Sequence, residues 1–223
     1  MIDAGFNPHR WAEGIDVSHW KPVKDWDALS KVGLSFFGVK ATEGNYNVDP
    51  ALEDHRKGVR VAGCFDLTIY YHFARTGNPM KQAKRFMDTV GPLRDNERLA
   101  LDVETVPEYS PGQSRLDAIS WINLFLSELM SVYTDRRPIL YTSKRMWRQF
   151  GNVPFTFIDQ TDLWVPRYND SMVEPSLPEP WSAWKFWQWT DGEWPERIVP
   201  GVGRCDSNFF NGTPADLHDY AKL

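Results

Sequence analysis

Short apolar stretches alternate with amphipathic stretches five times along the chain before the helical pattern fades. The apolar stretches that predict strands are 14–18, 34–41, a run ending at 70–75, 98–105 and 138–142. Three more predicted strands, at 162–165, 184–189 and 203–209, follow without a clear helix between them. Strands that alternate with helices form parallel sheets, so this order predicts an α/β fold. Five β/α units followed by three β-strands indicate an irregular TIM-like barrel.

Capping residues delimit the predicted helices. Asp25, Asn78-Pro79 and Ser143 are expected N-terminal caps, and Asp49-Pro50 is expected to start a helix that ends near Gly58. The longest helix is expected to open at a capping box in 110–113. We find no internal repeat or low-complexity linker, so residues 1–223 are predicted to form one domain, without a separate wall-binding domain.

Composition excludes several classes of function. The chain has a formal net charge of -5 and no basic run, which argues against nucleic-acid binding. The first eight residues lack the basic and apolar regions of a secretory signal, and no stretch is long enough to span a membrane. We therefore expect synthesis as a cytoplasmic protein without membrane insertion. Cys64 and Cys205 lie outside any C-x-x-C pattern and are expected to be buried free thiols.

Two carboxylates end the predicted strand 98–105. Asp102 and Glu104 are two residues apart, so in a strand they project to the same face while Val103 faces away. Their Cα atoms would lie ~7 Å apart. Two acids so close cannot both ionise freely, and one pKa rises. This arrangement suits a protonated general acid beside an ionised partner.

Two further acids are expected at the same end of the barrel. Asp16 lies near the end of the first predicted strand and Asp206 lies on the last, and these two strands are neighbours in a closed barrel. Four acids around one opening are solvated, bound to a metal or tuned for catalysis. Carboxylates alone can hold magnesium or calcium, whereas catalytic zinc needs histidine. His72 is expected to be a hydrogen-bonded core residue, and we predict neither a metal nor another cofactor.

Five motifs, in order, resemble those of the glycoside hydrolase family 25 lysozymes. They are Gly-Ile-Asp-Val-Ser-His-Trp at 14–20, Lys-Ala-Thr-Glu-Gly at 40–44, Tyr-His-Phe-Ala-Arg at 71–75, Leu-Asp-Val-Glu at 101–104, and the segment from the Trp-Gln-Trp of 187–189 to Asp206. The resemblance covers about 14–211. It implies an irregular barrel of five β/α units plus three strands, in agreement with the pattern above.

The resemblance also implies an activity. These lysozymes are N-acetylmuramidases of bacteria and phage endolysins, which cleave the β-1,4 bond between N-acetylmuramic acid and N-acetylglucosamine in peptidoglycan. It implies that Glu104 is the general acid/base, that Asp102 stabilises the intermediate, that Asp16 and Asp206 position substrate, and that the reaction retains configuration. A substrate-assisted and a covalent route both stay open. We expect a monomer that stays in the cytoplasm of a phage-infected host until lysis and then acts on the cell wall.

Substrate-binding candidates surround these acids. Tyr71, Tyr141, Trp187 and Trp189 are candidates to pack on a sugar, because aromatic faces suit pyranose rings. Lys40 and Arg75 are candidates to meet the muramyl lactate or a stem-peptide carboxylate, or else to pair with a cleft acid. In the strand predicted at 184–189, Trp184, Phe186 and Gln188 are expected to share a face.

The chain departs from the family pattern at 66–70, 165–168 and 194–197, which bears on substrate preference more than on chemistry. A chitinase-like N-acetylhexosaminidase and a catalytically silent cell-wall-binding module remain alternatives. A metal-dependent phosphodiesterase is a third, weakened by the lack of histidine ligands.

Overall fold

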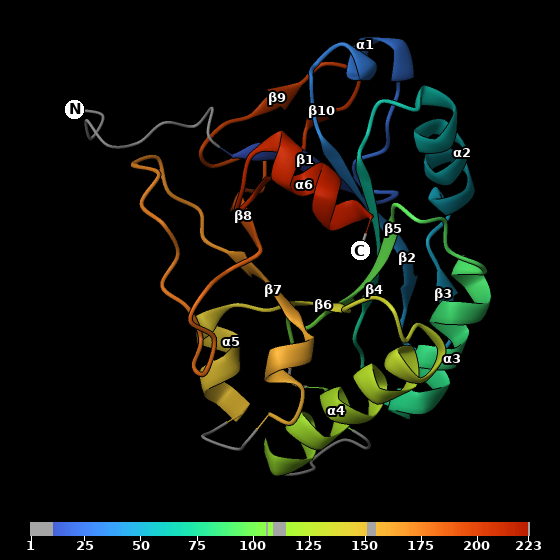
Figure 1. The fold of residues 1–223 in the computed structure, drawn as a ribbon, viewed down its shortest axis with the longest axis vertical. Helices are drawn as coiled ribbons and strands as arrows, with labels where there is room; N and C mark the ends of the chain where they lie inside the picture. The colour runs from blue at the N-terminus through green and yellow to red at the C-terminus, as the bar shows by residue number, and fades with distance from the viewer. Residues whose placement is uncertain (1–10, 106, 109–114, 151–154, 223) are drawn as a thin grey trace.

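Eight strands close into a barrel in the computed structural model, which describes residues 11–105, 107–108, 115–150 and 155–222 (Figure 1). Around the barrel these strands are β1 (Ala12–Val17), β2 (Phe36–Glu43), β4 (Leu67–Phe73), β5 (Glu97–Asp102), β6 (Ile139–Tyr141), β7 (Asp162–Pro166), β8 (Phe186–Thr190) and β11 (Asp206–Phe210). Neighbours from β1 to β8 are parallel, and β11 closes the ring antiparallel to both β8 and β1. The short strands β3 (Asn47–Val48), β9 (Ile198–Val199) and β10 (Gly203–Arg204) lie outside the ring.

One helix follows each of the first five barrel strands. These helices are α1 (Trp26–Ser30), α2 (Leu52–Ala62), α3 (Pro79–Val90), α4 (Arg115–Val132) and α5 (Lys144–Trp147). Short 3₁₀ turns occupy Arg148–Phe150 and Ile158–Gln160, and a final helix, α6 (Pro214–Ala221), follows β11. The predicted order of five β/α units and three further strands is therefore confirmed. No helix in the described part of the chain is long and apolar enough to cross a membrane.

The predicted caps are mostly confirmed. The side chains of Asp25, Asn78 and Ser143 each accept a backbone N–H in the first turn of the following helix. The predicted end of α2 at Gly58 is wrong, because the helix continues to Ala62 and stops at Gly63, whose φ is 59°. Gly58 is needed inside the helix: a Cβ there would lie 1.9 Å from the ring of Trp26. The predicted capping box at 110–113 lies outside the described residues.

Alternation along the strands separates two cores. Inward-facing side chains such as Phe36, Ala100 and Phe186 fill the barrel, whereas outward-facing ones such as Phe37 and Leu101 pack under the helices. This separation follows from the two-residue period of a strand.

Helix α6 covers the end of the barrel where the parallel strands begin (Figure 1). Its Leu217 and Ala221 belong to the inner core. The buried guanidinium of Arg98 on β5 donates hydrogen bonds to the carbonyls of Tyr220 and Ala221, at 3.2 and 3.1 Å. The opposite end of the barrel, where the parallel strands finish, therefore remains the open one.

Two smaller predictions are corrected. Strand β8 starts at Phe186, so Trp184 lies before it and packs with Trp187 on the outer side instead of sharing a face with Gln188. Of the two cysteines, Cys205 is buried but Cys64 is exposed just after the end of α2, and both are free.

Candidate active site

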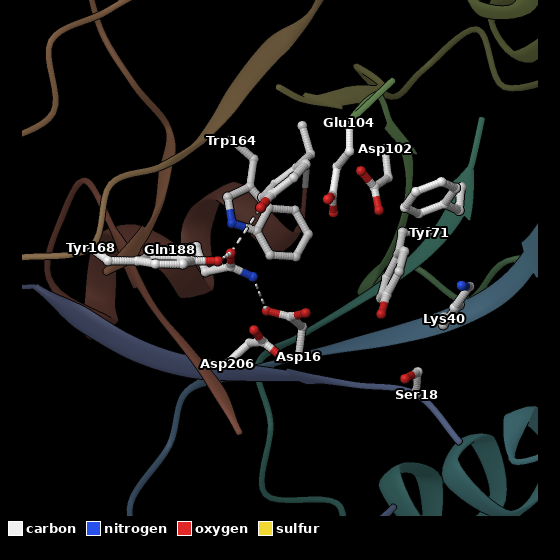
Figure 2. A pocket seen from close by; sticks show the side chains of 12 residues that line it. Asp16, Ser18, Lys40, Tyr71, Asp102, Glu104, Trp164, Tyr168, Gln188 and Asp206 are labelled. Carbon is white, nitrogen blue, oxygen red and sulfur yellow. Dashed lines mark hydrogen bonds between the residues drawn. The ribbon is translucent and has the colours of Figure 1, made fainter. Parts of the chain in front are cut away.

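A cavity of about 170 Å³ opens at the carboxyl ends of the barrel strands (Figure 2). Its lining comes from all eight barrel strands and the segments that follow them: Asp16, Ser18, Lys40, Tyr71, Phe73, Asp102, Glu104, Tyr141, Trp164, Tyr168, Gln188 and Asp206. All four predicted catalytic acids are among these residues, together with three of the six predicted substrate-binding residues. This is the end at which barrel enzymes carry their functional side chains.

Asp102 and Glu104 point into this cavity side by side (Figure 2). Asp102 is the last residue of β5, and Val103 turns outward into the core beneath the helices, where it is fully buried. The chain therefore keeps its strand-like alternation for one more residue, and the predicted common face is confirmed. Asp102 is 6% exposed, whereas Glu104 stands in a more open position.

Both carboxyl groups hold protons more tightly than usual. Burial raises the pKa of Asp102 well above its ordinary value, and the charge of Glu104 raises it further. Partial loss of solvent raises the pKa of Glu104, and the charge of Asp16 adds to this, while Lys40 acts in the opposite direction. Asp102 Oδ1 is buried without a hydrogen-bond partner among the described residues. Both carboxyl groups therefore favour their protonated forms, and Asp102 Oδ1 is an acceptor position left open.

Asp16 and Asp206 form the opposite wall. They are directly paired across the antiparallel ladder between β1 and β11, which confirms the prediction that the two acids approach each other. On its other side Asp16 lies beside Gly38 of β2. A Cβ at Gly38 would lie 2.5 Å from the Asp16 Cβ, so only glycine leaves room for this carboxylate.

Amide and hydroxyl groups hold Asp16 in place. Its Oδ2 accepts hydrogen bonds from Gln188 Nε2 at 3.0 Å and from Asn208 Nδ2 at 2.8 Å. Gln188 Oε1 in turn accepts the hydroxyls of Tyr141 and Tyr168, each at 2.8 Å, and Figure 2 shows Tyr168 beside Gln188. Burial raises the pKa of Asp16, and the two amide donors partly offset that rise. This wall of the cavity is thus fixed by side chains from four different barrel segments.

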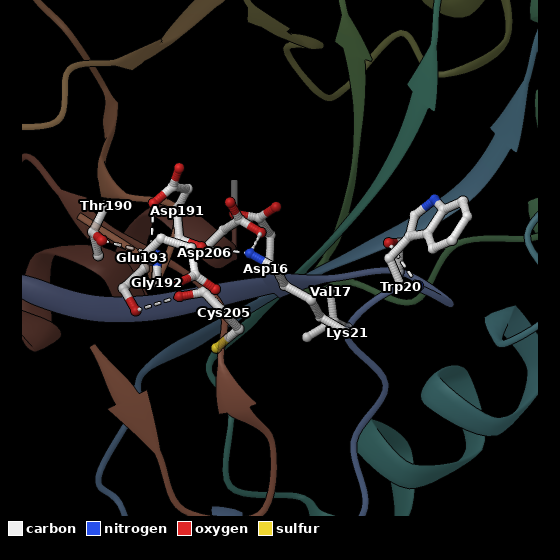
Figure 3. Close-up of polar contacts among 12 residues, drawn as sticks. Asp16, Val17, Trp20, Lys21, Thr190, Asp191, Gly192, Glu193, Cys205 and Asp206 are labelled. Atoms are coloured by element: carbon white, nitrogen blue, oxygen red, sulfur yellow. Dashed lines mark hydrogen bonds and ion pairs between the residues drawn. The ribbon is translucent and has the colours of Figure 1, made fainter. Parts of the chain in front are cut away.

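A lysine lies against the second acid of this wall. Lys21 Nζ is 3.6 Å from Asp206 Oδ2 and also donates to the carbonyl of Asp191 (Figure 3). Burial and the neighbouring Asp16 raise the pKa of Asp206 to about 8, although Lys21 lowers it. Asp206 therefore carries a proton for much of its time near neutral pH.

The predicted cationic residues form an ion-pair cluster. Lys40 lines the cavity and its Nζ lies 2.7 Å from Glu43 Oε2, while the Arg75 guanidinium lies 2.7 Å from Glu43 Oε1. Both cations also stand over the ring of Phe73. Both cations therefore pair with Glu43, which like Arg75 lies outside the cavity lining, and contact with a substrate carboxylate stays a prediction.

Trp187 and Trp189 do not line the cavity. Trp187 is 0% exposed, packs against Trp11 and Trp184, and donates its Nε1–H to the carbonyl of Arg167. Trp189 stacks on Phe209 on the same outer side, with ring centroids 5.6 Å apart. Trp187 is fully buried, so the prediction that it packs on a sugar is wrong, whereas Trp189 is partly exposed outside the cavity lining and its role stays a prediction. Tyr71 and Tyr141 do line the cavity.

His72 is a core residue, as expected. Its Nδ1 lies 2.7 Å from Thr42 Oγ1 and its Nε2 lies 2.9 Å from Gln82 Oε1. Complete burial lowers the pKa of His72 to about 4, so the ring is neutral at pH 7. Within the described ranges, no three His, Cys, Asp or Glu side chains are grouped so that they could hold a metal ion.

The sequence does not point to several residues of the site, four of which hold its wall in place. They are Trp164, Tyr168, Gln188 and Asn208. One signal was available for Gln188, because it is the polar residue between two tryptophans in a strand whose faces alternate. The others depend on register between strands far apart in the sequence.

Comparisons with known proteins agree with this geometry. The family model described as "Glycosyl hydrolases family 25" matches residues 15–196. Lysozyme M1 of Streptomyces globisporus is 31% identical over 216 residues, which is 92% of this chain and 69% of that protein.

Two solved structures have the same fold. The bacterial lysozyme from Streptomyces coelicolor superimposes with a TM-score of 0.82 at 28% identity, over 95% of this chain and 97% of that one. A family GH25 lysozyme from Aspergillus fumigatus gives 0.80 at 30% identity, over 96% and 100%. In both structural comparisons the similarity covers at least 95% of this chain.

Proposed function

The chain belongs to the glycosyl hydrolases of family 25, and on that premise we propose that it cleaves the β-1,4 bond between N-acetylmuramic acid and N-acetylglucosamine in peptidoglycan, with Glu104 as general acid/base. It is a glycoside hydrolase of the lysozyme, or muramidase, class. One observation carries the proposal: Asp102 and Glu104 are directed into one cavity with both pKa values raised.

In the first step Glu104 donates its proton to the glycosidic oxygen as the bond from that oxygen to C1 breaks. Glu104 suits this role because it is the more exposed of the two acids and because its raised pKa keeps it protonated at higher pH than an ordinary glutamate. The carbonyl oxygen of the substrate's own 2-acetamido group bonds to C1 and forms an oxazolinium ion. The two electrons of the broken bond leave with the protonated oxygen.

Asp102 supports the acetamido group in this step. Its buried Oδ1 lacks a partner among the described residues, and an acetamido N–H would satisfy that acceptor. In the free protein, burial favours the proton on Asp102. The bound N–H stabilises the ionised form of Asp102, which leaves the proton on Glu104 and places a negative charge beside the oxazolinium ion.

In the second step water attacks C1 while Glu104 takes up a proton from it, and the bond from C1 to the acetamido oxygen breaks. Two displacements at C1 retain the β configuration in the product. Asp16 and Asp206 form the fixed wall opposite Glu104 and position the sugar through their hydrogen-bonded network.

Digestion of purified peptidoglycan tests this function. New reducing ends are reduced with borohydride and identified by mass spectrometry. We expect reduced muramic ends from the wild type, and a loss of about 10²–10⁴-fold in turnover for Glu104→Gln without loss of the fold. Glu53→Gln, at an exposed position on α2, is the matched control and should keep full activity. Reduced glucosamine ends, or an active Glu104→Gln protein, would contradict the proposal.

The stereochemical course is tested separately. Proton NMR of a short glycan oligomer during the first minutes of cleavage distinguishes the β from the α anomer of the new end. We expect the β anomer to appear first. Initial release of the α anomer would show inversion and exclude the oxazolinium route.

A further inference from the structure

A second cavity lies beside the first, on the other side of Glu104. It has a volume of about 290 Å³ and is lined by Val103, Glu104, Tyr141, Ser143, Pro166, Arg167 and Tyr168. Glu104, Tyr141 and Tyr168 line both cavities. A group that protonates a glycosidic oxygen must stand between the two sugars which that oxygen joins. The second cavity is therefore placed to hold the part of the glycan strand across the scissile bond.

The backbone of Arg167 is fixed at the edge of this cavity. Its N–H donates to the carbonyl of Gln188 at 2.9 Å, and its carbonyl accepts the Nε1–H of Trp187 at 2.8 Å. Both partners belong to β8, so the barrel fixes the backbone position of Arg167. The side chain itself is exposed, and its guanidinium makes no ion pair with any residue that the structure describes.

Other polar groups of the second cavity are already engaged. Ser143 Oγ accepts the N–H of Met146 as the cap of α5. The hydroxyls of Tyr141 and Tyr168 both donate to Gln188. Among the described lining residues, Arg167 is the only cation, so its guanidinium is the charged donor left for a ligand. A guanidinium offers a planar pair of N–H groups that matches an oxyanion.

We propose that the second cavity binds the glycan strand across the scissile bond and that Arg167 pairs with a carboxylate of a neighbouring muramyl unit, on its lactate or its stem peptide. This inference rests on the proposed function and adds a specificity-determining residue to it.

The test compares two forms of one substrate. Peptidoglycan is first treated with hydrofluoric acid, which removes phosphodiester-linked polymers and so excludes phosphate as the anion. Half is then amidated with carbodiimide and ammonia, which converts its carboxylates into neutral amides. Rates of reducing-end release are measured on both forms for the wild type, Arg167→Gln, Arg167→Lys and Arg85→Gln. Arg85 is exposed on α3 and controls for the loss of one positive charge.

We expect Arg167→Gln to lose roughly fivefold in kcat/KM on the carboxylate form, the scale of a partly solvated ion pair, and to match the wild type on the amidated form. Arg167→Lys should keep part of the preference for the carboxylate form over the amidated form, and Arg85→Gln should keep all of it. An equal loss on both forms, or no loss on either, would overturn the role of Arg167. A wild type that cuts neither form would overturn the proposed function itself.

Discussion

Asp16 on β1 and Asp206 on β11 lie directly opposite each other in the ladder that closes the barrel. Like charges in this position repel, and burial of both carboxyl groups adds to the cost of ionising them. Amide donors stabilise Asp16, and Lys21 stands beside Asp206. When both carboxyl groups are ionised, their repulsion therefore lowers the folding stability of the protein.

Replacing Asp206 with asparagine should stabilise the fold at alkaline pH. The pKa of Asp206 is about 8 in the folded protein and near 3.8 when unfolded, so the folded state binds more protons. The contribution of this carboxyl group to the stability of the folded protein is therefore highest below pH 4 and falls as pH rises toward 8. We expect Asp206→Asn to gain melting temperature over the wild type as pH rises from 5, and to melt at least about 2 °C higher at pH 8.5, the shift from roughly 1 kcal/mol in a chain of this size. A lower melting temperature at pH 8.5 would contradict this.

The charge of Lys21 should lower the pKa of Asp206. Removing its charge with Lys21→Met takes away the neighbouring cation that lowers this pKa, so the Asp206 carboxyl should titrate at higher pH. Carbon-13 NMR of the carboxyl carbon measures this directly. Lys24→Met removes the same charge from an exposed site three residues away and should leave the titration where it is. If both variants give the same Asp206 titration, the contact with Lys21 has no electrostatic effect.

The Asp102→Asn variant removes the charge of this side chain but keeps its size. Asparagine fills the same space but cannot become the anion proposed to stabilise the intermediate, so turnover should fall by about 10²–10³-fold. The fold should keep or gain stability at pH 7, because a buried carboxyl with a raised pKa is replaced by a neutral group. Rate measurements on peptidoglycan and thermal melts check the two halves. A near-normal rate would remove Asp102 from the mechanism.

Gly38→Ala should damage the cavity through Asp16. The new methyl group would come within 2.5 Å of the Asp16 Cβ and 3.3 Å of the Trp164 ring, so the acid must shift. We expect a loss of stability of about 1–3 kcal/mol together with a reduced kcat. Gly58→Ala is the control, since it clashes with Trp26 far from the cavity. That variant should lose stability but keep its kcat while folded. An equal fall in kcat for both variants would show a general effect of destabilisation.

Periodicity and strand order were enough to predict the positions of the acids. A two-residue period places Asp102 and Glu104 on one face whatever the rest of the barrel does, and closure of a ring makes the first and last strands neighbours. The caps at Asp25 and Asn78 are likewise local, because each depends only on the next few residues.

Features that depend on distant contacts could not be predicted in this way. Alternation shows that Trp187 and Gln188 face opposite sides, but only the barrel decides that glutamine faces inward and tryptophan outward. Sequence alone therefore favours the aromatic side chain for the cavity and gives no reason to choose the amide. Gly58 reads as the end of a helix in the sequence, because the ring of Trp26, which requires a glycine there, comes from another helix.

The cavity is complete only when β11 pairs with β1, and β11 is the last barrel strand that the ribosome synthesises. Asp16 is synthesised early, whereas its partners Gln188 and Asn208 follow 172 and 192 residues later. A nascent chain that has already produced Asp102 and Glu104 still lacks the wall that faces them. We therefore expect no hydrolysis from partly synthesised chains, so that activity starts only when the last barrel strand has left the ribosome.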